Sequence, residues 1–242
     1  MRYAIFSDIH SNLEALNAVL DAYKKERVDK YLCIGDLVGY GADPKECIKR
    51  AKEVADVICA GNHDWGSVNL FPLDFFNSNA RTAVLWTRKN LEGPGKVYLE
   101  SLKLVFADQD LTLVHGTLDD PQEFNYMTDA YIAEETFKLM RTNVCFLGHT
   151  HTAGVFEKVK DENIYYREAV NFYINDYGKY IVNVGSVGQP RDRNPRPSYC
   201  IFDTGQRVVE LKRVDYDIET ARKKILGAGL PEFLADRLLT GR

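Results

Sequence analysis

Short runs of β-forming residues alternate with helical patterns in the first part of the chain, and this order limits the folds that it can adopt. Strands are expected at residues 3–6, 31–34 and 57–59. The segments between these runs carry apolar residues at the spacing of amphipathic helices. Parallel strands connected by buried helical crossovers follow from such an alternation. The sequence therefore predicts an α/β fold.

Capping signals mark the starts of the first two helices. Ser11 and Glu14 have the spacing of a capping box, and an apolar stripe follows them. Asp43 precedes Pro44, which fits an N-cap followed by proline at the first helical position. We therefore expect Ser11 and Asp43 to be the N-caps of these helices.

The segment near 65–100 is rich in aromatic residues and asparagine, and we interpret it as an insertion over the edge of the sheet. A helix is predicted at 80–91, and it is expected to end at the sequence Gly93-Pro94-Gly95. The aromatic side chains of this segment are interpreted as core rather than as a surface that stacks on a base. The role of the insertion stays open.

The later part of the chain predicts a further sheet. Residues 102–106 and 111–114 flank a polar turn and are expected to form a hairpin. A helix at 129–140 precedes a buried strand at 144–147. The short runs that follow predict an antiparallel second sheet, with strands at 155–159, 164–169, 180–184, 199–203 and 207–213.

Length and composition fit one globular domain over residues 1–242, with a helical tail near 216–242 that packs on the outside. The helices of this tail are expected at 218–226 and 231–239. The N-terminal apolar run is far too short for a secretory signal or a membrane span, so a cytoplasmic protein without a membrane partner is expected. Five cysteines without paired spacing predict buried free thiols. A formal net charge of −4 gives no general attraction for nucleic acid, so an anionic ligand needs a local site.

The five histidines follow apolar, strand-like runs, and a further run ends in the sequence Ile34-Gly35-Asp36. Because sites in open α/β sheets form beyond the carboxyl ends of the strands, these segments are expected to converge on one crevice. Asp8 and His10 are two residues apart, so on extended backbone both side chains point to one face. The same holds for His149 and His151. Carboxylate, imidazole and carboxamide groups without a thiolate suit Mn²⁺, Fe or Zn²⁺ better than a soft metal.

Five short motifs occur along the chain in the order Asp8-Ile9-His10, Gly35-Asp36, Gly61-Asn62-His63-Asp64, His115-Gly116 and Gly148-His149-Thr150-His151. In this order they resemble the signature of the calcineurin-like metallophosphoesterase superfamily. The stretches 7–13, 35–41 and 185–191 are similar to small bacterial and archaeal phosphodiesterases and to diadenosine-tetraphosphatase-like members. The resemblance covers roughly residues 3–190 and implies a four-layer αββα sandwich, in which helices flank two facing mixed β-sheets.

The resemblance also implies two divalent metal ions, with Mn²⁺ preferred and Fe, Zn²⁺ or Ni²⁺ as alternatives. Carried over by position, the first ion is held by Asp8, His10, Asp36 and His151, and the second by Asp36, Asn62, His115 and His149. Two such ions would lower the pKa of a bridging water and supply a hydroxide for in-line attack on phosphorus. His63 remains after the ligands are assigned, so it is expected to protonate or stabilise the leaving oxygen, with Asp64 orienting it.

The second motif departs from one branch of the family. Protein Ser/Thr phosphatases continue it with an aspartate and an arginine, where this chain has Gly39 and Tyr40. The missing arginine argues against a phosphoprotein substrate. The glycine-rich segment before Arg191 offers backbone N–H groups and a guanidinium to a phosphate, although an ordinary turn with a solvated arginine fits equally well. Asn12 is a second candidate for contact with the anion, but a helix N-cap is its favoured role.

The expected enzyme hydrolyses phosphodiesters or nucleotide polyphosphates, and its expected partner is a small phosphoester or nucleotide. A phosphomonoesterase or protein phosphatase and a nuclease are alternative enzymes, although the acidic net charge argues weakly against a nuclease. A protein-binding scaffold of the same fold, similar to a retromer subunit, is a further alternative. That lineage lacks the histidine of the Asn-His pair, whereas His63 is present here, so an enzyme is the favoured interpretation.

Overall fold

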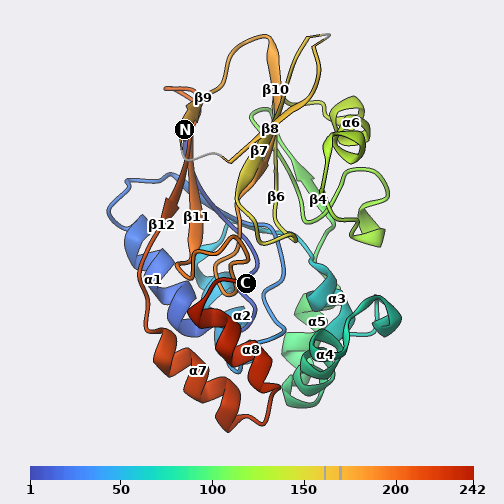
Figure 1. The fold of residues 1–242 in the computed structure, drawn as a ribbon, viewed down its shortest axis with the longest axis vertical. Helices are drawn as coiled ribbons and strands as arrows, with labels where there is room; N and C mark the ends of the chain where they lie inside the picture. Colours follow the sequence, from blue (N-terminus) through green and yellow to red (C-terminus); the bar gives the residue numbers. More distant parts are fainter. Residues whose placement is uncertain (161, 169–170) are drawn as a thin grey trace.

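Two β-sheets lie face to face and helices cover their outer surfaces (Figure 1) in a computed structural model that describes residues 1–160, 162–168 and 171–242. The first sheet has six strands, in the spatial order β3 (Val57–Ile58), β2 (Lys30–Cys33), β1 (Arg2–Phe6), β11 (Ser198–Asp203), β12 (Val208–Arg213) and β9 (Asn171–Tyr173). The second also has six, in the order β4 (Val105–Ala107), β5 (Thr112–Val114), β6 (Val144–Leu147), β10 (Gly178–Asn183), β7 (Gly154–Val159) and β8 (Tyr165–Arg167).

The helices occur in three groups along the chain. Those of the N-terminal half are α1 (Leu13–Tyr23), α2 (Pro44–Val54), α3 (Asn62–Ser67), α4 (Ser78–Asn90) and α5 (Gly93–Glu100). The helix of the second half is α6 (Ala130–Leu139), and those of the tail are α7 (Ile218–Gly227) and α8 (Glu232–Asp236). Short 3-10 turns occur at η1 (Leu73–Phe75), η2 (Pro121–Glu123) and η3 (Arg237–Leu239).

Both sheets are mixed. In the first, β1, β2 and β3 are parallel, whereas β1 with β11, β11 with β12 and β12 with β9 are antiparallel. In the second, β5, β6 and β10 are parallel and the other pairs are antiparallel. The predicted strand–helix–strand order of the first part and the predicted hairpin of β4 with β5 are therefore confirmed.

The prediction of an antiparallel second sheet from the later strands is wrong. β7, β8 and β10 join a mixed sheet, whereas β11 and β12 return to the first sheet beside β1. All six residues of β11 are buried, because this strand lies between two others and is covered on both faces. A run without alternation carries no signal for the sheet that it joins. β9 was not expected, and residue 169 of the predicted run 164–169 lies outside the described residues.

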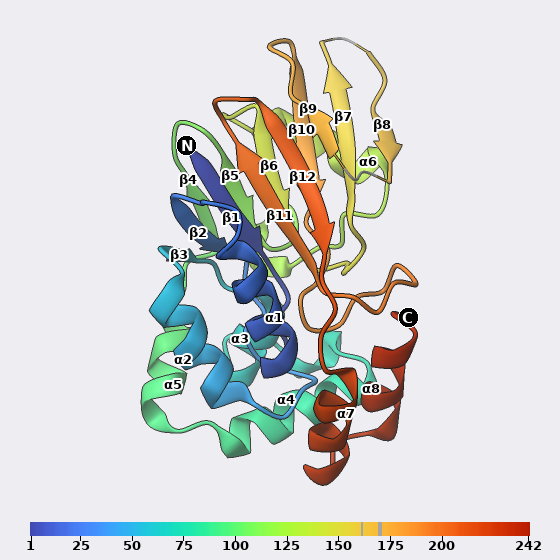
Figure 2. The same cartoon turned by 90° about the vertical axis from the view of Figure 1, so that its left-hand side faces the viewer.

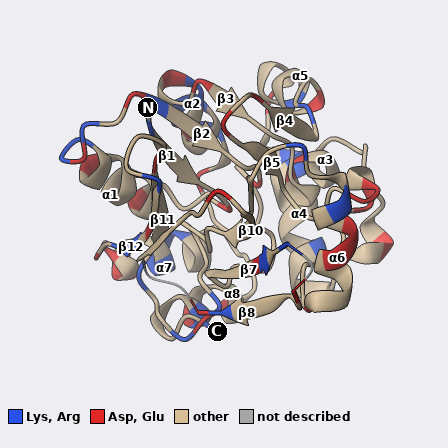
Figure 3. Ribbon diagram, turned by 90° about the horizontal axis from the view of Figure 1, so that it is seen from above, with Lys and Arg blue, Asp and Glu red and all other residues tan. Residues whose placement is uncertain are grey.

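Alternating side chains along the strands define four layers. Tyr3 and Ile5 of β1 face the core between the sheets, whereas Ala4 and Phe6 pack with the helices of the outer layer. β6 alternates in the same way between the inner core and the cluster that contains α6. Figure 3 shows α1 and α6 on opposite sides of the two sheets. The αββα sandwich that the resemblance implied is therefore confirmed.

The start of α1 differs from the predicted capping box. The N-cap is Asn12, whose side-chain oxygen accepts a hydrogen bond from Ala15 N at 3.1 Å. Ser11 has φ +52° and its N–H donates to the carbonyl oxygen of Leu37, so it belongs to the loop after β1. Asp43 is the N-cap residue of α2 as predicted, but its side chain makes no capping hydrogen bond.

The segment 65–100 is more helical than predicted. α4 ends at Asn90, close to the expected end, but the sequence Gly93-Pro94-Gly95 then begins α5. Proline fits this position because the first turn of a helix has no internal partner for the N–H that proline lacks. The short α3 was not expected.

The tail packs against α4 and against two loops of the sandwich (Figures 1 and 2). Tyr40, in the loop after β2, belongs to the same apolar cluster as Ile225 of α7 and Leu234 of α8. The end of the chain reaches a second loop, where the N–H of Arg193 donates to the carbonyl oxygen of Gly241 at 2.8 Å. The tail therefore braces the loop of Tyr40 and the loop of Arg193.

The five cysteines are buried and free, which confirms the predicted thiols. Within the described residues, no helix has the length and apolar character to cross a membrane.

Candidate metal centre

Side chains from five separate segments meet at one end of the sheets. They are Asp8 and His10 after β1, Asp36 after β2, Asn62 at the start of α3, His115 after β5, and His149 and His151 after β6. Asn62 is 7% exposed and the other six are more deeply buried. The structure thus brings together the segments that the sequence predicted to converge.

Five of these residues have left-handed backbone conformations, namely Asp8 (φ 56°), His10 (φ 49°), Asp36 (φ 52°), His149 (φ 66°) and His151 (φ 61°). Non-glycine residues adopt positive φ rarely, and such strain concentrates at functional sites. The prediction that each pair is aimed by extended backbone is therefore wrong. Tight turns beyond the strand ends aim these side chains instead.

Three histidines are oriented by backbone carbonyl groups. Nδ1 of His10 lies 3.0 Å from Val38 O, and Nδ1 of His115 lies 2.7 Å from Ile34 O. Nδ1 of His151 lies 2.6 Å from the carbonyl oxygen of Gln189. A carbonyl oxygen only accepts, so each Nδ1 carries a proton, and in the neutral ring Nε2 then presents a lone pair to the cluster. This is the tautomer that a metal ligand requires.

In each of the two carboxylates, one oxygen accepts a backbone hydrogen bond and the other faces the histidines of the cluster. Asp8 Oδ2 accepts from His149 N at 3.0 Å, and Asp36 Oδ1 accepts from the N–H of His63 at 2.8 Å. The other oxygens face imidazole nitrogens, with Asp8 Oδ1 3.1 Å from His151 Nε2. Asp36 Oδ2 lies 3.3 Å from His115 Nε2 and 3.5 Å from His10 Nε2. Oδ2 of Asp36 therefore lies between the imidazole of His10, from the loop after β1, and that of His115, from the loop after β5.

Several buried oxygen and nitrogen atoms of this cluster lack hydrogen-bond partners among the described residues. They are Asp8 Oδ1, Asn62 Oδ1, His115 Nε2 and His149 Nε2. In addition, Nε2 of His10 and Nε2 of His151 lie 2.9 Å apart, and neutral rings protonated at Nδ1 have no proton to place between them. Buried acceptors without a donor are costly, and a cation satisfies them. The groups Asp8, His10, His151 and Asp36, His115, His149 each bring three ligand atoms within reach of one ion.

The pKa values of the cluster agree with cation binding. Burial lowers the pKa of His149 to about 3 and that of His151 to about 3, so both imidazoles are neutral and able to ligate near pH 7. Burial also disfavours charge on His115, but Asp36 and Asp8 outweigh it and raise the pKa of His115 to about 9. Without a cation, His115 therefore carries a proton on Nε2 near pH 7, in a strongly negative field that a metal cation would neutralise in its place.

His63 lies beside the cluster, with its ring centroid 4.8 Å from that of His10 and 4.4 Å from that of Tyr40. Its Nδ1 has no hydrogen-bond partner among the described residues. His63, His10 and Asp36 also form a third group within reach of one cation. His63 is therefore close enough to act on a substrate at the cluster.

Asp64 does not make the expected contact with His63. Its Oδ1 accepts from the N–H groups of Leu37 and Val38 at 2.8 and 3.2 Å, and its Oδ2 accepts from Gly61 N at 3.1 Å. Burial, and then the charge of Asp36, raise the pKa of Asp64 to about 8. Asp64 therefore supports the loop that carries Asp36, and no bond to His63 is found in the part of the chain that the structure describes.

Replacement of this carboxyl is expected to lower stability. Asp64→Ala leaves three buried N–H groups unpaired, each costing about 1–3 kcal/mol, so the free energy of unfolding should fall by about 3 kcal/mol or more. For a chain of this size the melting temperature should fall by about 6–12 °C. Calorimetry checks this against Asp74→Ala, whose side chain is 90% exposed. An unchanged melting temperature with lost activity would instead give Asp64 a catalytic role.

The departure at the second motif has a structural basis. Gly39 has φ +94°, and a Cβ there would lie 2.3 Å from His63 Nδ1. An aspartate at this position would therefore displace His63. Tyr40 packs on the His63 ring, and its hydroxyl accepts from Arg191 Nη2 at 3.2 Å. The Arg191 backbone N–H donates to the carbonyl oxygen of His151 at 3.1 Å, which ties this arginine to the cluster.

Asn12 has its polar atoms occupied by the fold. Its oxygen caps α1, and its Nδ2 donates to Gly188 O at 2.9 Å and to the hydroxyl of Tyr216 at 3.4 Å. With 4% of its surface exposed, Asn12 is buried as well. We therefore assign it the N-cap role and no contact with an anion.

Tyr126 was not predicted to belong to the site. Its ring stacks on the imidazole of His149, with centroids 3.9 Å apart and an interplanar angle of 16°. Gly116 makes this possible, because a Cβ there would lie 2.7 Å from the carbonyl oxygen of Asn125. The contact depends on the path of the loop after β5, and no local sequence pattern signals it.

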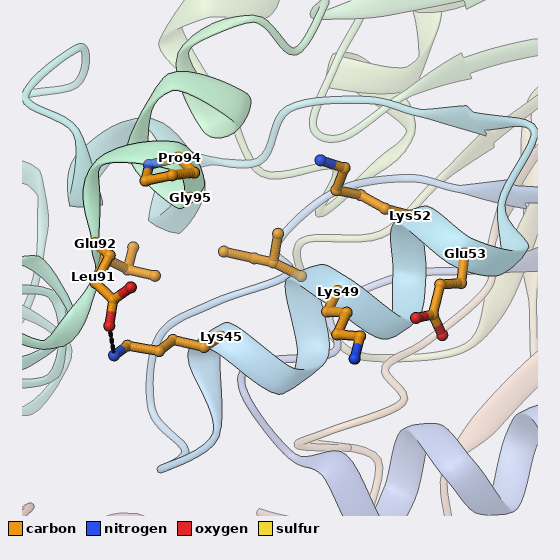
Figure 4. Close-up of a pocket in the computed structure, with 9 residues that line it drawn as sticks. Lys45, Lys49, Lys52, Glu53, Leu91, Glu92, Pro94 and Gly95 are labelled. Atoms are coloured by element: carbon orange, nitrogen blue, oxygen red, sulfur yellow. Dashed lines mark hydrogen bonds and ion pairs between the residues drawn. The ribbon is translucent and has the colours of Figure 1, made fainter.

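A hollow of about 480 Å³ between α2 and the start of α5 is separate from this centre (Figure 4). Ile48 and Leu91 line its apolar part, and Lys45 forms an ion pair with Glu92 across one end. None of its lining residues belongs to the candidate ligands, so we assign it no part in the chemistry.

Comparison with known proteins gives consistent matches over the chain. Residues 1–207 match the calcineurin-like phosphoesterase superfamily domain. An uncharacterised protein of Methanocaldococcus jannaschii is 38% identical over 243 residues, which cover 99% of this chain and 98% of that protein. The crystal structure of a metallophosphoesterase from Sphaerobacter thermophilus is 40% identical with a TM-score of 0.88, covering 100% of this chain and 99% of the other. A hypothetical protein of Pyrococcus horikoshii shares the fold, with 19% identity and a TM-score of 0.80. The match covers 100% of this chain and 98% of the other.

Proposed function

This chain belongs to the calcineurin-like phosphoesterase superfamily and is a phosphoric ester hydrolase, and from that premise we propose that it hydrolyses phosphodiesters or nucleotide polyphosphates with two divalent cations. The observation that carries the proposal is the set of buried acceptor atoms that face one another without donors. Divalent cations would satisfy several of these atoms at once. Mn²⁺ is the proposed metal because the ligands are imidazoles, carboxylates and a carboxamide.

The two proposed metal groups share Asp36. Asp8, His10, Asp36 and His151 would hold the first ion, and Asp36, Asn62, His115 and His149 would hold the second. Two bound divalent cations would supply an acidified water as nucleophile and neutralise charge on the phosphoryl oxygens. The hydrogen bonds from Nδ1 to backbone carbonyls keep each Nε2 aimed at its ion. His63 is proposed to act on the leaving oxygen, because it lies beside the cluster with a free ring nitrogen. Burial lowers the pKa of His63 well below its usual value, so a bound phosphate anion would be needed to hold a proton on this ring.

Substrate preference is proposed to depend on Arg191 and on Tyr40. The chain lacks the arginine that follows the second motif in protein phosphatases, and Tyr40 occupies that position. A single guanidinium, that of Arg191, remains next to the Tyr40 hydroxyl. A phosphodiester carries one negative charge on its phosphate, whereas a phosphomonoester near pH 7 carries close to two. One guanidinium therefore supports a diester or an internal phosphate better than a terminal dianion.

Steady-state kinetics with Mn²⁺ test this function. We expect a higher kcat/KM for bis-p-nitrophenyl phosphate and for dinucleoside polyphosphates than for p-nitrophenyl phosphate or phosphoserine peptides. A chelator should abolish turnover, and added Mn²⁺ should restore it. A higher kcat/KM on phosphoserine peptides than on every diester and dinucleotide would contradict the proposed preference, and turnover that survives complete removal of metal would contradict the dimetal chemistry.

Arg191→Ala is expected to lower kcat/KM on the best diester. The corresponding loss of transition-state stabilisation is roughly 1–3 kcal/mol, the scale of a lost charge-assisted hydrogen bond. Metal content should not change, because the guanidinium contacts Tyr40 and Gln189 rather than a carboxylate ligand. Arg196→Ala is the matched control, since its side chain is 57% exposed and pairs with a surface aspartate. Equal kinetics for both variants and the parent protein would remove Arg191 from the mechanism.

A further inference from the structure

A cavity of about 500 Å³ lies beside the candidate metal centre, between the loop after β5 and the start of α6. Its volume falls within the roughly 300–1,000 Å³ that is usual for small-molecule sites. Thr117, two residues beyond His115, lines one part of it, and Tyr126 lines another. Because the Tyr126 ring stacks on His149, this tyrosine forms a wall between the cavity and the metal ligands.

The loop that forms this wall is firmly held. The backbone of Phe124 and Asn125 packs directly on Gly116, where a Cβ would have no room. Phe124 is 3% exposed and its ring packs edge-on against that of His115, with centroids 5.9 Å apart. Tyr126 follows this anchor by two residues and is 49% exposed, so its ring is accessible while its position is fixed. Such a preorganised aromatic ring is suited to binding a planar group.

The lining of the cavity is acidic, whereas Arg191 lies near the hydroxyl of Tyr126 without being part of that lining. Its lining includes the acidic residues Asp119 and Glu135, and no lysine or arginine of the described chain is part of that lining. Glu135 pairs with Lys138 at 2.8 Å, whereas Asp119 has no ion-pair partner among the described residues. Asp119 therefore remains free to accept hydrogen bonds from a ligand. Tyr131, which is 87% exposed, adds a second aromatic side chain to the lining.

We propose that this cavity binds the nucleoside part of the substrate, with an amino-substituted base stacked on Tyr126 and its donor groups directed to Asp119. The proposal rests on the proposed function, since the phosphate of the same substrate would lie at the metal cluster. The acidic lining keeps phosphate groups out of the cavity and thereby fixes the orientation of the substrate. The site selects a planar, uncharged group that donates hydrogen bonds.

Direct binding of adenosine tests the cavity without any turnover. Calorimetry should detect adenosine binding to the metal-loaded protein, and inosine should bind more weakly because an oxo group replaces the exocyclic amine. Tyr126→Ala should weaken adenosine binding by roughly 5- to 150-fold, the effect of removing one base–aromatic stack. Tyr173→Ala, whose side chain is 78% exposed on β9 outside the cavity, should leave it unchanged.

Asp119→Asn separates hydrogen bonding from stacking. This variant should lose most of the preference for adenosine over inosine, because a carboxamide both accepts and donates and can pair with either the amine or the oxo group. Equal affinities of the parent protein, Tyr126→Ala and Tyr173→Ala for adenosine would overturn the proposal. A preference for adenosine that is unchanged in Asp119→Asn would overturn the assigned hydrogen bond.

Kinetics distinguish this proposal from the function on which it rests. The p-nitrophenyl ester of adenosine 5′-monophosphate and methyl p-nitrophenyl phosphate share a leaving group and differ in the nucleoside. Tyr126→Ala should lower the ratio of their kcat/KM values by at least about fivefold, the lower end of the range for one stack. An unchanged ratio with both esters hydrolysed would overturn the cavity and leave the proposed function standing. If neither ester is hydrolysed, the proposed function is overturned. The calorimetric comparison of adenosine binding then tests the cavity without reference to turnover.

Discussion

Asp36→Asn is expected to reduce turnover by several orders of magnitude and to remove bound metal, while the fold is retained. Oδ2 of Asp36 lies between His10 and His115, which belong to different candidate metal groups. The carboxamide carries no charge, and its NH₂ group would donate to the imidazole nitrogens that are the proposed metal ligands. Two metal sites would thus lose their shared ligand. Metal analysis and kcat on bis-p-nitrophenyl phosphate measure the two effects.

Asp74→Asn is the matched control for this variant, because its side chain is 90% exposed and belongs to none of the candidate metal groups. It should bind metal and turn over like the parent protein. Two tightly held ions and near-normal turnover in Asp36→Asn would refute the bridging assignment. A large fall in the melting temperature of Asp36→Asn would show that the activity is lost through unfolding. In that case Asp36→Glu, which keeps the charge, tests whether bound metal and activity are restored together.

His63→Ala should lower kcat by about 10²–10⁴-fold, the range for removal of a general acid. The metal content should stay the same, because His63 is proposed to act on the leaving oxygen and not to bind an ion. The loss should be large for an alkyl leaving group and small for nitrophenolate, since a good leaving group needs no proton. Rates on a matched pair of alkyl and nitrophenyl diesters measure this difference.

The proximity of His63 to His10 and Asp36 makes metal content the decisive readout. Loss of an ion in His63→Ala would move this histidine into the ligand shell. Equal rate losses for alkyl and nitrophenyl esters would contradict proton donation while leaving the metal assignment intact. Phe75→Ala is a suitable control from the same aromatic surroundings, because Phe75 is 68% exposed.

The candidate ligands could be predicted from the sequence because their types and order carry the chemistry. Histidines and aspartates that follow apolar strands must meet where parallel strands end, whatever the detail of the turns. The turns themselves could not be predicted. His149 and His151 adopt positive φ because the surrounding packing outweighs their local preference, and no residue pattern around them signals this.

Contacts between distant segments are the second class of feature that could not be predicted from the sequence. β11 is apolar on both faces, so its pairing with β1 depends on the whole sandwich and not on its own periodicity. Ser11 matched a capping pattern, yet Asn12 caps the helix because the backbone of Ser11 bonds to the neighbouring loop. The stack of Tyr126 on His149 likewise follows from the close approach of two loops.

The tail suggests where substrate range can diverge within this architecture. The region that matches the family, residues 1–207, contains the candidate ligands, whereas the helices that brace the loops of Tyr40 and Arg193 come later in the chain. The side chains proposed to select the substrate lie in the same region as the ligands, but the helices that support two of their loops come from a separate stretch of sequence. Variation of the tail would reshape the surroundings of Arg191 without touching a metal ligand. A library confined to residues 216–242 is therefore an economical starting point for redirecting such an enzyme to new esters.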